Sequence, residues 1–405
     1  MAQLEKKSGV GVIWALIGTA AAGLAAGAAA SHYAGRKTRA IARAAHAPPP
    51  PAKTPEDYDA EEPGRGRAAD RPERIPRKGW TDIFWRLGAS YFGDRIGFLA
   101  GGVTFFVALS LFPTLGALVT VYGLFADPSQ AAERLQLLYS VLPAGVADFL
   151  AEEMQRLAEN SATELTVTLV WTLILSLWTA NGAVKMLFYG LNVAYHEVER
   201  RNIVRYNLVC MGFTGSGFLA VLASSALVVG VPIILEVMGL ADEWRHLTPL
   251  RWPVLLVVYI AALTLAYRIG PSRARARWRW LTPGAIFAGL LSLGLSFGFS
   301  WYVQTFVRTA SYGPLAAMMG FLLWTWLTVQ IVLMGAELNA EIEHQTAVDT
   351  TTGEPRPIGE RGAVVADSVG PRRGNPAALA FTMRHAEALS DRLLRRRIRR
   401  EAEKD

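Results

Sequence analysis

The sequence predicts an all-α fold, a polytopic membrane helix bundle with six core transmembrane helices and an additional N-terminal anchor helix. Of its 405 residues, 52% are hydrophobic and only 19% are charged, whereas soluble domains have about a quarter charged residues. The apolar residues lie in runs of roughly 20 or more, long enough to cross a hydrocarbon core about 30 Å thick. Strands of membrane barrels alternate polar and apolar residues over about ten positions, so these continuous runs predict helices.

Residues 1–46 are predicted to form a membrane anchor with a basic flank. Residues 9–30 are uncharged and rich in Ala and Gly, and basic residues lie on both sides of them. Thr19, Gly23 and Gly27 share one helix face, and small residues at this spacing allow a second helix to approach closely. A homo-oligomer formed through this helix is therefore expected. A cleaved signal peptide is the alternative, because a basic start and an Ala-rich end also fit that pattern.

Two segments outside the core are predicted to be disordered. Residues 47–78 form a Pro-rich linker with too little apolar surface to fold alone. The tail at 345–405 is rich in Gly, Pro and Thr up to Asn375, and from Ala377 it becomes a basic amphipathic helix. Such a helix binds membrane surfaces, or alternatively remains solvated through Glu–Arg pairs.

Residues 79–344 are predicted to form the six-helix membrane domain. Its first segment has apolar residues at helical spacing interrupted by Asp82, Arg86 and Asp94, which predicts an amphipathic helix at the membrane interface. Apolar runs follow at 96–125, 165–189, 206–235, 252–267, 281–307 and 314–336.

Two local features refine this prediction. Pro113 lies inside the first run and predicts a kink, because proline removes one helix hydrogen bond. Residues 127–163 have a broken amphipathic pattern, which predicts two short helices packed on the bundle, with an exposed loop as the alternative.

The distribution of Lys and Arg predicts the orientation of the core. The loops after the second and fourth runs are rich in arginine, whereas the opposite loops have one or two arginines each. The positive-inside rule then places both core termini in the cytoplasm. The net charge of +7 is explained by these loops and by contact with anionic membrane lipids, so nucleic acid is not an expected partner.

The sequence predicts no catalytic, cofactor-binding or metal-binding residues, and so not an enzyme. The six histidines are scattered, without the spacing of a metal site such as H-E-x-x-H. The phosphate-binding loop G-x-x-x-x-G-K-[ST] does not occur. The one match to G-x-S-x-G, from Gly294 to Gly298, lies inside an apolar run, so a nucleophile elbow between a strand and a helix is not expected there. The single cysteine, Cys210, lies in an apolar run and has no partner for an intrachain disulfide.

Polar residues inside the spans are the candidate functional residues, because ionisable groups in a bilayer are costly. Asn181, Lys185 and Asn192 share one face of the second run and are expected to line a polar groove. The alternative is that Lys185 extends its ammonium group to the lipid headgroups. Further candidates for the same polar pathway are Gln304, Gln330 and Glu337.

Glu337 lies near the end of the sixth run. One interpretation pairs Glu337 with Lys185, and the other leaves it solvated at the interface.

Four stretches of the core form a recognisable set. They are AGGVTFFVALSLFP at 100–113, LWTANGAVKMLFYGLNVAY at 177–195, SYGPLAA at 311–317 and GAELNAE at 335–341. The motif residues are Tyr312, Gly313, Pro314, Gly335, Glu337, Asn339 and Glu341. On these stretches the chain resembles the YihY/virulence factor BrkB family of bacterial inner-membrane proteins, formerly described as ribonuclease BN-like.

This resemblance implies six core helices, a location in the bacterial cytoplasmic membrane and no established enzymatic activity. Ribonuclease activity is not expected, in agreement with the absence of a metal-binding motif. The leading hypothesis is a transporter or flippase-like protein for a lipid or small envelope component. The alternative is a non-transporting envelope scaffold or a virulence or serum-resistance-type factor.

Overall fold

The computed structural model describes residues 53–125, 162–225, 227, 250–302 and 313–374. Within these ranges the regular structure is helical, which confirms the all-α prediction. The helices are α2 (Pro55–Glu61), the 3-10 helix η1 (Pro72–Arg74), α3 (Arg77–Gly93), α4 (Ile96–Phe125), α7 (Ala162–Ala194), α8 (Ile203–Ser225), α11 (Arg251–Ile269), α12 (Trp278–Tyr302) and α13 (Gly313–Glu343).

The six predicted runs correspond in order to α4, α7, α8, α11, α12 and α13. Among the described residues, four helices are long and apolar enough to cross a membrane, and α3 with α4 adds a fifth when this bent pair counts as one span. A multi-pass membrane protein is therefore confirmed, and the described part of the chain supports four or five of the six predicted spans.

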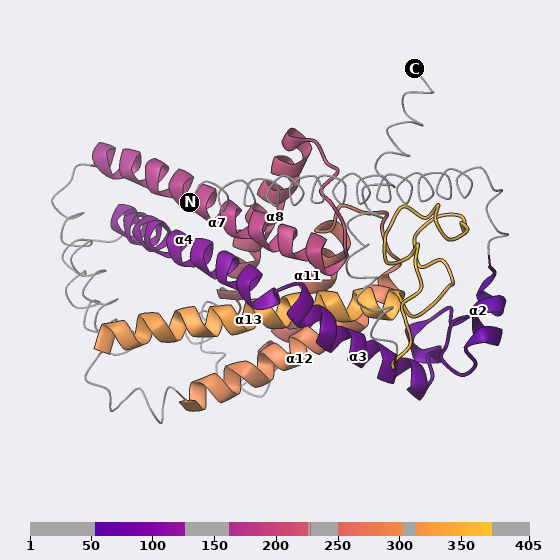
Figure 1. Ribbon diagram of the computed structural model, residues 1–405. Coiled ribbons are helices and arrows are strands. Elements are labelled where there is room, and N and C mark those ends of the chain that lie inside the picture. The colour runs from indigo at the N-terminus through magenta and orange to yellow at the C-terminus, as the bar shows by residue number, and fades with distance from the viewer. Residues whose placement is uncertain (1–52, 126–161, 226, 228–249, 303–312, 375–405) are drawn as a thin grey trace, which may run out of the picture. The chain divides into compact units, whose positions relative to one another are not determined.

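The spans pack in pairs around a shared core. In Figure 1, α4 runs beside α7 and α12 runs beside α13, which also contacts α3 and α4. Phe188 and Leu191 of α7, Tyr267 of α11 and Leu333 of α13 are almost completely buried in this core.

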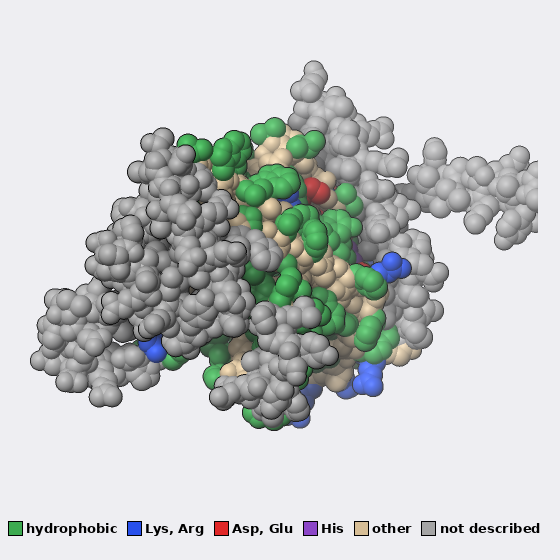
Figure 2. Space-filling model, turned by 90° about the vertical axis from the view of Figure 1, so that its left-hand side faces the viewer, with side chains coloured by type: hydrophobic (Ala, Val, Ile, Leu, Met, Phe, Trp, Pro, Cys, Tyr) green, Lys and Arg blue, Asp and Glu red, His purple; other side chains and the backbone are tan. Residues whose placement is uncertain are grey.

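Large apolar side chains also cover the outside of the helices. Trp171 and Trp178 of α7, Val257 of α11 and Phe297 of α12 are all exposed. Figure 2 shows hydrophobic side chains over much of the described surface on one face, with Lys and Arg mainly near its edges. Such a surface is stable where it contacts lipid, in agreement with the membrane prediction.

The charged face of α3 points inward, which differs from the prediction of an interfacial helix. Asp82 and Arg86 are fully buried, whereas Phe84 and Phe92 on the same helix are exposed. Burial of these charges is possible because each is paired, Asp82 with Arg65 and Arg86 with a carboxylate of α13. The apolar face is therefore the one left at the surface.

The segments predicted to be disordered differ most from the sequence analysis. Residues 53–76 of the linker and 344–374 of the tail are ordered and joined by the buried side chain of Arg67. Its Nη1 donates to the carbonyl of Gln345 at 3.1 Å, and its Nη2 donates to the carbonyl of Gly370 at 2.8 Å. The backbone N–H of Ala347 returns a bond of 2.7 Å to the Arg67 carbonyl. These polar contacts order the segments together with a few buried apolar side chains, among them Ile75 of the linker and Val365 of the tail.

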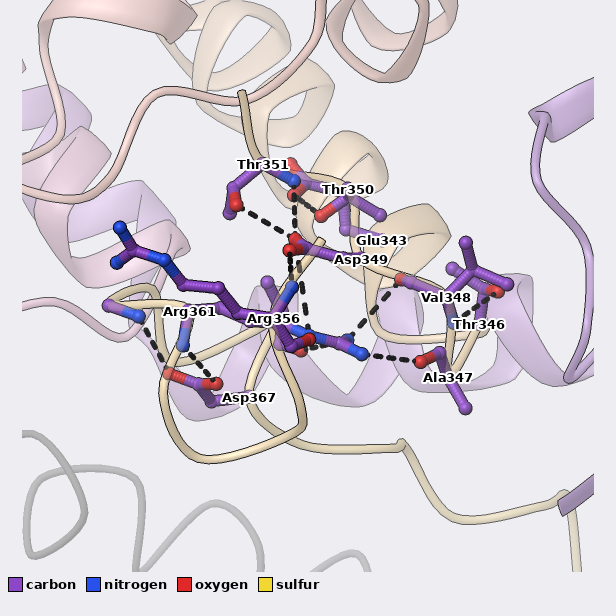
Figure 3. A network of polar contacts seen from close by, with 12 residues as sticks. Glu343, Thr346, Ala347, Val348, Asp349, Thr350, Thr351, Arg356, Arg361 and Asp367 are labelled. Atoms are coloured by element: carbon purple, nitrogen blue, oxygen red, sulfur yellow. Dashed lines mark hydrogen bonds and ion pairs between the residues drawn. The ribbon is translucent and has the colours of Figure 1, made fainter. Parts of the chain in front are cut away.

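A second network folds the tail segment on itself, as Figure 3 shows. Arg361 is buried and donates to the carbonyls of Ala347 and Ala366, each at 2.7 Å. The carboxylate of Asp367 accepts backbone N–H groups of Gly359, Arg361 and Gly362 at 2.7–3.0 Å. These bonds replace the regular hydrogen bonds that a helix or sheet would supply.

Several predictions lie outside the described residues and stay predictions. They are the anchor in 1–46, the short helices in 127–161, the basic helix from Ala377, and the positions of Gln304 and Tyr312. Pro113 lies inside α4, which continues past it to Phe125.

Candidate functional site

α3 and α4 form a bent pair whose break lies against a buried carboxyl group of α13. The helix axis bends by 59° between α3 and α4, at Asp94 and Arg95. Arg95 has a left-handed backbone conformation with φ 53°. Glu337 is fully buried. Its strongest charge–charge interactions are with two other acidic side chains, Asp94 and Glu341. No N–H or hydroxyl group of a described residue donates to the Glu337 carboxylate. Neighbouring carboxyl groups shielded from water favour uptake of a proton or a cation.

The next two carboxylates of α13 are each held by an arginine from a different part of the chain. Arg86 Nε of α3 lies 2.5 Å from Glu341 Oε2, and both side chains are almost completely buried. Arg273, in the loop after α11, donates through Nη2 to both oxygens of Glu343 at 2.8 and 2.7 Å. The end of α13 is therefore fixed by ion pairs to two distant parts of the chain.

Asn339, also on α13, joins this helix to α12. Its Oδ1 accepts the backbone N–H of Gly284 at 2.7 Å, and its Nδ2 donates to the carbonyl of Leu281 at 2.8 Å. These two groups flank Pro283, which cannot donate a backbone hydrogen bond inside α12. A Cβ at Gly335 would lie only 2.7 Å from the Gly284 carbonyl oxygen, so the close crossing of the helices requires glycine there.

Asn192 near the end of α7 and two glutamates of the following loop form a second polar cluster, in which Glu197 is buried and Glu199 is half-buried. Asn192 Oδ1 accepts the N–H of Ser272 at 2.7 Å, and its Nδ2 donates to Glu199 at 3.1 Å. Glu197 accepts Arg200 at 2.6 Å and the N–H of Val364 at 2.7 Å. Burial outweighs these favourable contacts and raises the pKa of Glu197 to about 7.

The predicted polar pathway is distributed over several contacts. Asn181 is buried against α8, where its Oδ1 accepts the hydroxyl of Thr214 at 3.4 Å. Lys185 is half-buried, and no ion pair to Glu337 is present within the described ranges. Asn192 lies instead in the loop cluster. The three residues share α7 but contact different elements.

Gln330 and the motif residues occupy defined places on α13. Gln330 is buried and accepts a hydrogen bond from the hydroxyl of Tyr91 on α3. Gly313 and Pro314 begin α13.

Sequence reasoning treated the charges of α3 as interfacial and did not assign them to the site. A signal was present, because Asp82, Arg86, Ser90 and Asp94 recur every four residues and so share one helix face. Arg86, Ser90 and Asp94 all contact carboxylates of α13. A polar stripe on an otherwise apolar helix therefore marked a face buried against polar partners.

Comparison with known proteins relates this chain to a group of membrane proteins. A family model described as virulence factor BrkB matches residues 89–358. A ribonuclease-like protein of Bacillus subtilis, YfkH, is 26% identical over 59% of this chain and 86% of its own length. A UPF0761 membrane protein of Aliivibrio fischeri is 26% identical over 67% of this chain and 86% of its own length.

A further UPF0761 membrane protein, from Nitrosospira multiformis, is 25% identical over 60% of this chain, and the match spans only 57% of that relative. No solved structure matches the chain.

Proposed function

Since the chain belongs to the virulence factor BrkB family of membrane proteins, we propose a membrane function for it, that of a transporter or flippase-like protein rather than an enzyme. Its substrate class is a lipid or a small envelope component. The chain lies in the bacterial inner membrane with both core termini in the cytoplasm, in contact with membrane lipids and self-associated through its N-terminal helix.

The observation that carries this proposal is the broken span beside a buried acid. Transporters commonly place binding sites at breaks in membrane helices, where polar side chains contact substrates or coupling ions. Here the break at Asp94 and Arg95 lies beside Glu337, a fully buried carboxyl group on an apolar helix. A charge in this position is costly, and uptake and release of a proton or cation is a function that would account for a carboxyl group there.

The test is transport by the purified full-length chain in liposomes, measured as lipid scrambling and solute uptake. Glu337→Gln keeps the size of the side chain and removes a like charge beside Asp94, so this variant is expected to fold and to lose transport. Glu354→Gln is the matched control, because Glu354 is exposed in the tail segment. Lys185→Met tests the pathway predicted along α7.

Two results would contradict the proposal at different levels. If folded Glu337→Gln transports as well as wild type does, Glu337 is not part of the transport site. No transport of any lipid or solute by folded wild-type protein would refute the transporter function itself. The scaffold hypothesis rests on residues 1–46 and the basic tail helix, both outside the described ranges, and it stays a prediction.

A further inference from the structure

A cavity of about 760 Å³ at one end of the bundle is lined mainly by arginine. Its walls are the loop after α7 with the start of α8, the end of α11 with the following loop, and residues 356–362 of the tail segment. Eight of the 17 residues that line it are arginines, and Glu360 is the one carboxylate among these lining residues.

Four of the arginines are already compensated by carboxylates. Arg200, Arg201 and Arg273 lie 2.6–2.7 Å from glutamates, and Arg361 lies 3.9 Å from an aspartate. Their partners are Glu197, Glu199, Glu343 and Asp349.

The other four arginines give the cavity its excess positive charge. Arg205, Arg268, Arg275 and Arg356 form no ion pair within the described ranges. The guanidinium of Arg268 stacks 4.2 Å from the ring centre of Trp278. In Figure 3, the side chain of Arg356 points away from the tail network and makes no contact with it. Among the lining residues, only the carboxylate of Glu360 offsets these four positive charges.

Buried donors in the same cavity lining lack acceptors. Arg200 Nε, Arg268 Nε and Arg273 Nη1 are buried and find no hydrogen-bond acceptor within the described ranges. The side chain of Arg273 is only 2% exposed, so it is a fixed part of the wall rather than a surface chain. Buried donors of a charged group without acceptors are costly, and oxygens of a bound anion would satisfy them.

The positive-inside rule explains why this end of the protein is basic, but not why the arginines converge on one cavity with unsatisfied donors. Ile269, the last residue of a candidate span, lines the cavity, and the span of α7 ends at Ala194, close to Arg200 in sequence. The cavity therefore lies beside the end of a candidate span, where lipid headgroups are expected.

We propose that this cavity binds a phosphate-bearing anion, either the headgroup of an anionic lipid or a soluble phosphate compound. A guanidinium group can donate two parallel hydrogen bonds to the oxygens of one phosphate group. Several guanidinium groups around one cavity therefore favour a multiply charged phosphate over a ligand with a single carboxylate. This binding is independent of the transport proposal, because it requires no movement across the membrane.

The test measures ligand-induced stabilisation of the purified full-length chain in a neutral detergent. One arm titrates inorganic pyrophosphate, and the other titrates short-chain phosphatidic acid against phosphatidylcholine with the same acyl chains. Arg275→Gln with Arg356→Gln removes two exposed, unpaired charges, so the unliganded protein should remain stable. Arg77→Gln with Arg372→Gln is the control, because it removes two exposed arginines outside the cavity lining.

The double cavity variant should bind at least ~10-fold more weakly, the loss expected of one charge-assisted hydrogen bond, whereas the control should bind as wild type does. Glu360→Gln should bind more tightly, a gain that misfolding cannot produce. Saturable binding of phosphatidic acid alone identifies a lipid site, and saturable binding of pyrophosphate identifies a soluble one. No saturable binding in either arm, or equal losses in the cavity and control variants, would overturn the proposal.

Discussion

The ion pair between Arg86 and Glu341 is buried, so its removal should have a large effect on stability. Their side chains are 0% and 4% exposed, and Nε lies 2.5 Å from Oε2. Arg86 also donates to the carbonyls of Pro371 and Glu341, each at 3.0 Å, and to Gln345 Oε1 at 2.8 Å. Substitution Arg86→Met keeps an unbranched side chain that reaches about as far as Nε and removes every one of these donors.

The expected magnitude follows from the charge that remains. Removal of one partner of a buried pair typically costs about 3–5 kcal/mol, because the other charge is left without compensation. Arg86→Met with Glu341→Leu removes both charges and should therefore recover much of this loss. The control is Arg74→Met, since Arg74 pairs with Asp70 at 2.8 Å but both side chains are well exposed. Exposed pairs of this kind contribute about 0–1 kcal/mol.

The assay is denaturant unfolding in detergent, followed by tryptophan fluorescence, for wild type, Arg86→Met, Glu341→Leu, the double variant and Arg74→Met. Limited proteolysis adds a local measurement, because Arg86 holds the tail at Pro371 and its loss should expose residues 344–374 to cleavage. The reasoning is refuted if Arg86→Met is no less stable than Arg74→Met. It is also refuted if the double variant loses the sum of the two single losses.

Two other substitutions test neighbouring contacts. Asn339→Ala should destabilise the fold by about 1–3 kcal/mol, the value of two interhelical hydrogen bonds in a membrane protein. The control Asn207→Ala should have little effect, because the amide of this half-buried residue donates to Ile203 of its own helix, and equal unfolding midpoints would contradict this role of Asn339. Since burial raises the pKa of Glu197 from 4.5 to about 7, its contribution to stability is present below pH 4.5 and is lost as pH rises through 7. Wild type should therefore lose stability relative to Glu197→Gln between about pH 5 and pH 8, and a constant difference in unfolding midpoint would exclude this effect.

The sequence predicted the helices well because their formation depends on local composition. The first run was predicted to begin at residue 96, where α4 begins, and α4 extends to Phe125, the last described residue before 162, since continuous apolar residues in lipid must satisfy their backbone groups within one helix. Both ends of α11 and the start of α12 were predicted within three residues of the observed bounds. Partners between helices could not be predicted in this way, because Glu337 contacts Asp94 of the α3–α4 break rather than Lys185.

The order of the tail was missed for a related reason. Composition measures how much apolar surface a segment can bury, whereas residues 344–374 are held by specific hydrogen bonds to groups far away in sequence. Arg67 and Gly370 are separated by 303 positions. Asp349 and Asp367 are acidic residues in a loop by sequence, and only the folded chain shows that each accepts several backbone N–H groups.

The contact between Arg67 and Gly370 also constrains the order of assembly during synthesis. Arg67 leaves the ribosome before the first core span, and its acceptors at Gln345 and Gly370 follow the last one. These two hydrogen bonds can therefore form only after every intervening helix has been synthesised. Until that moment, the guanidinium of Arg67 and the carbonyls that it later binds remain accessible to water, chaperones and proteases. Formation of these hydrogen bonds thus distinguishes a completely synthesised chain from a truncated or stalled one.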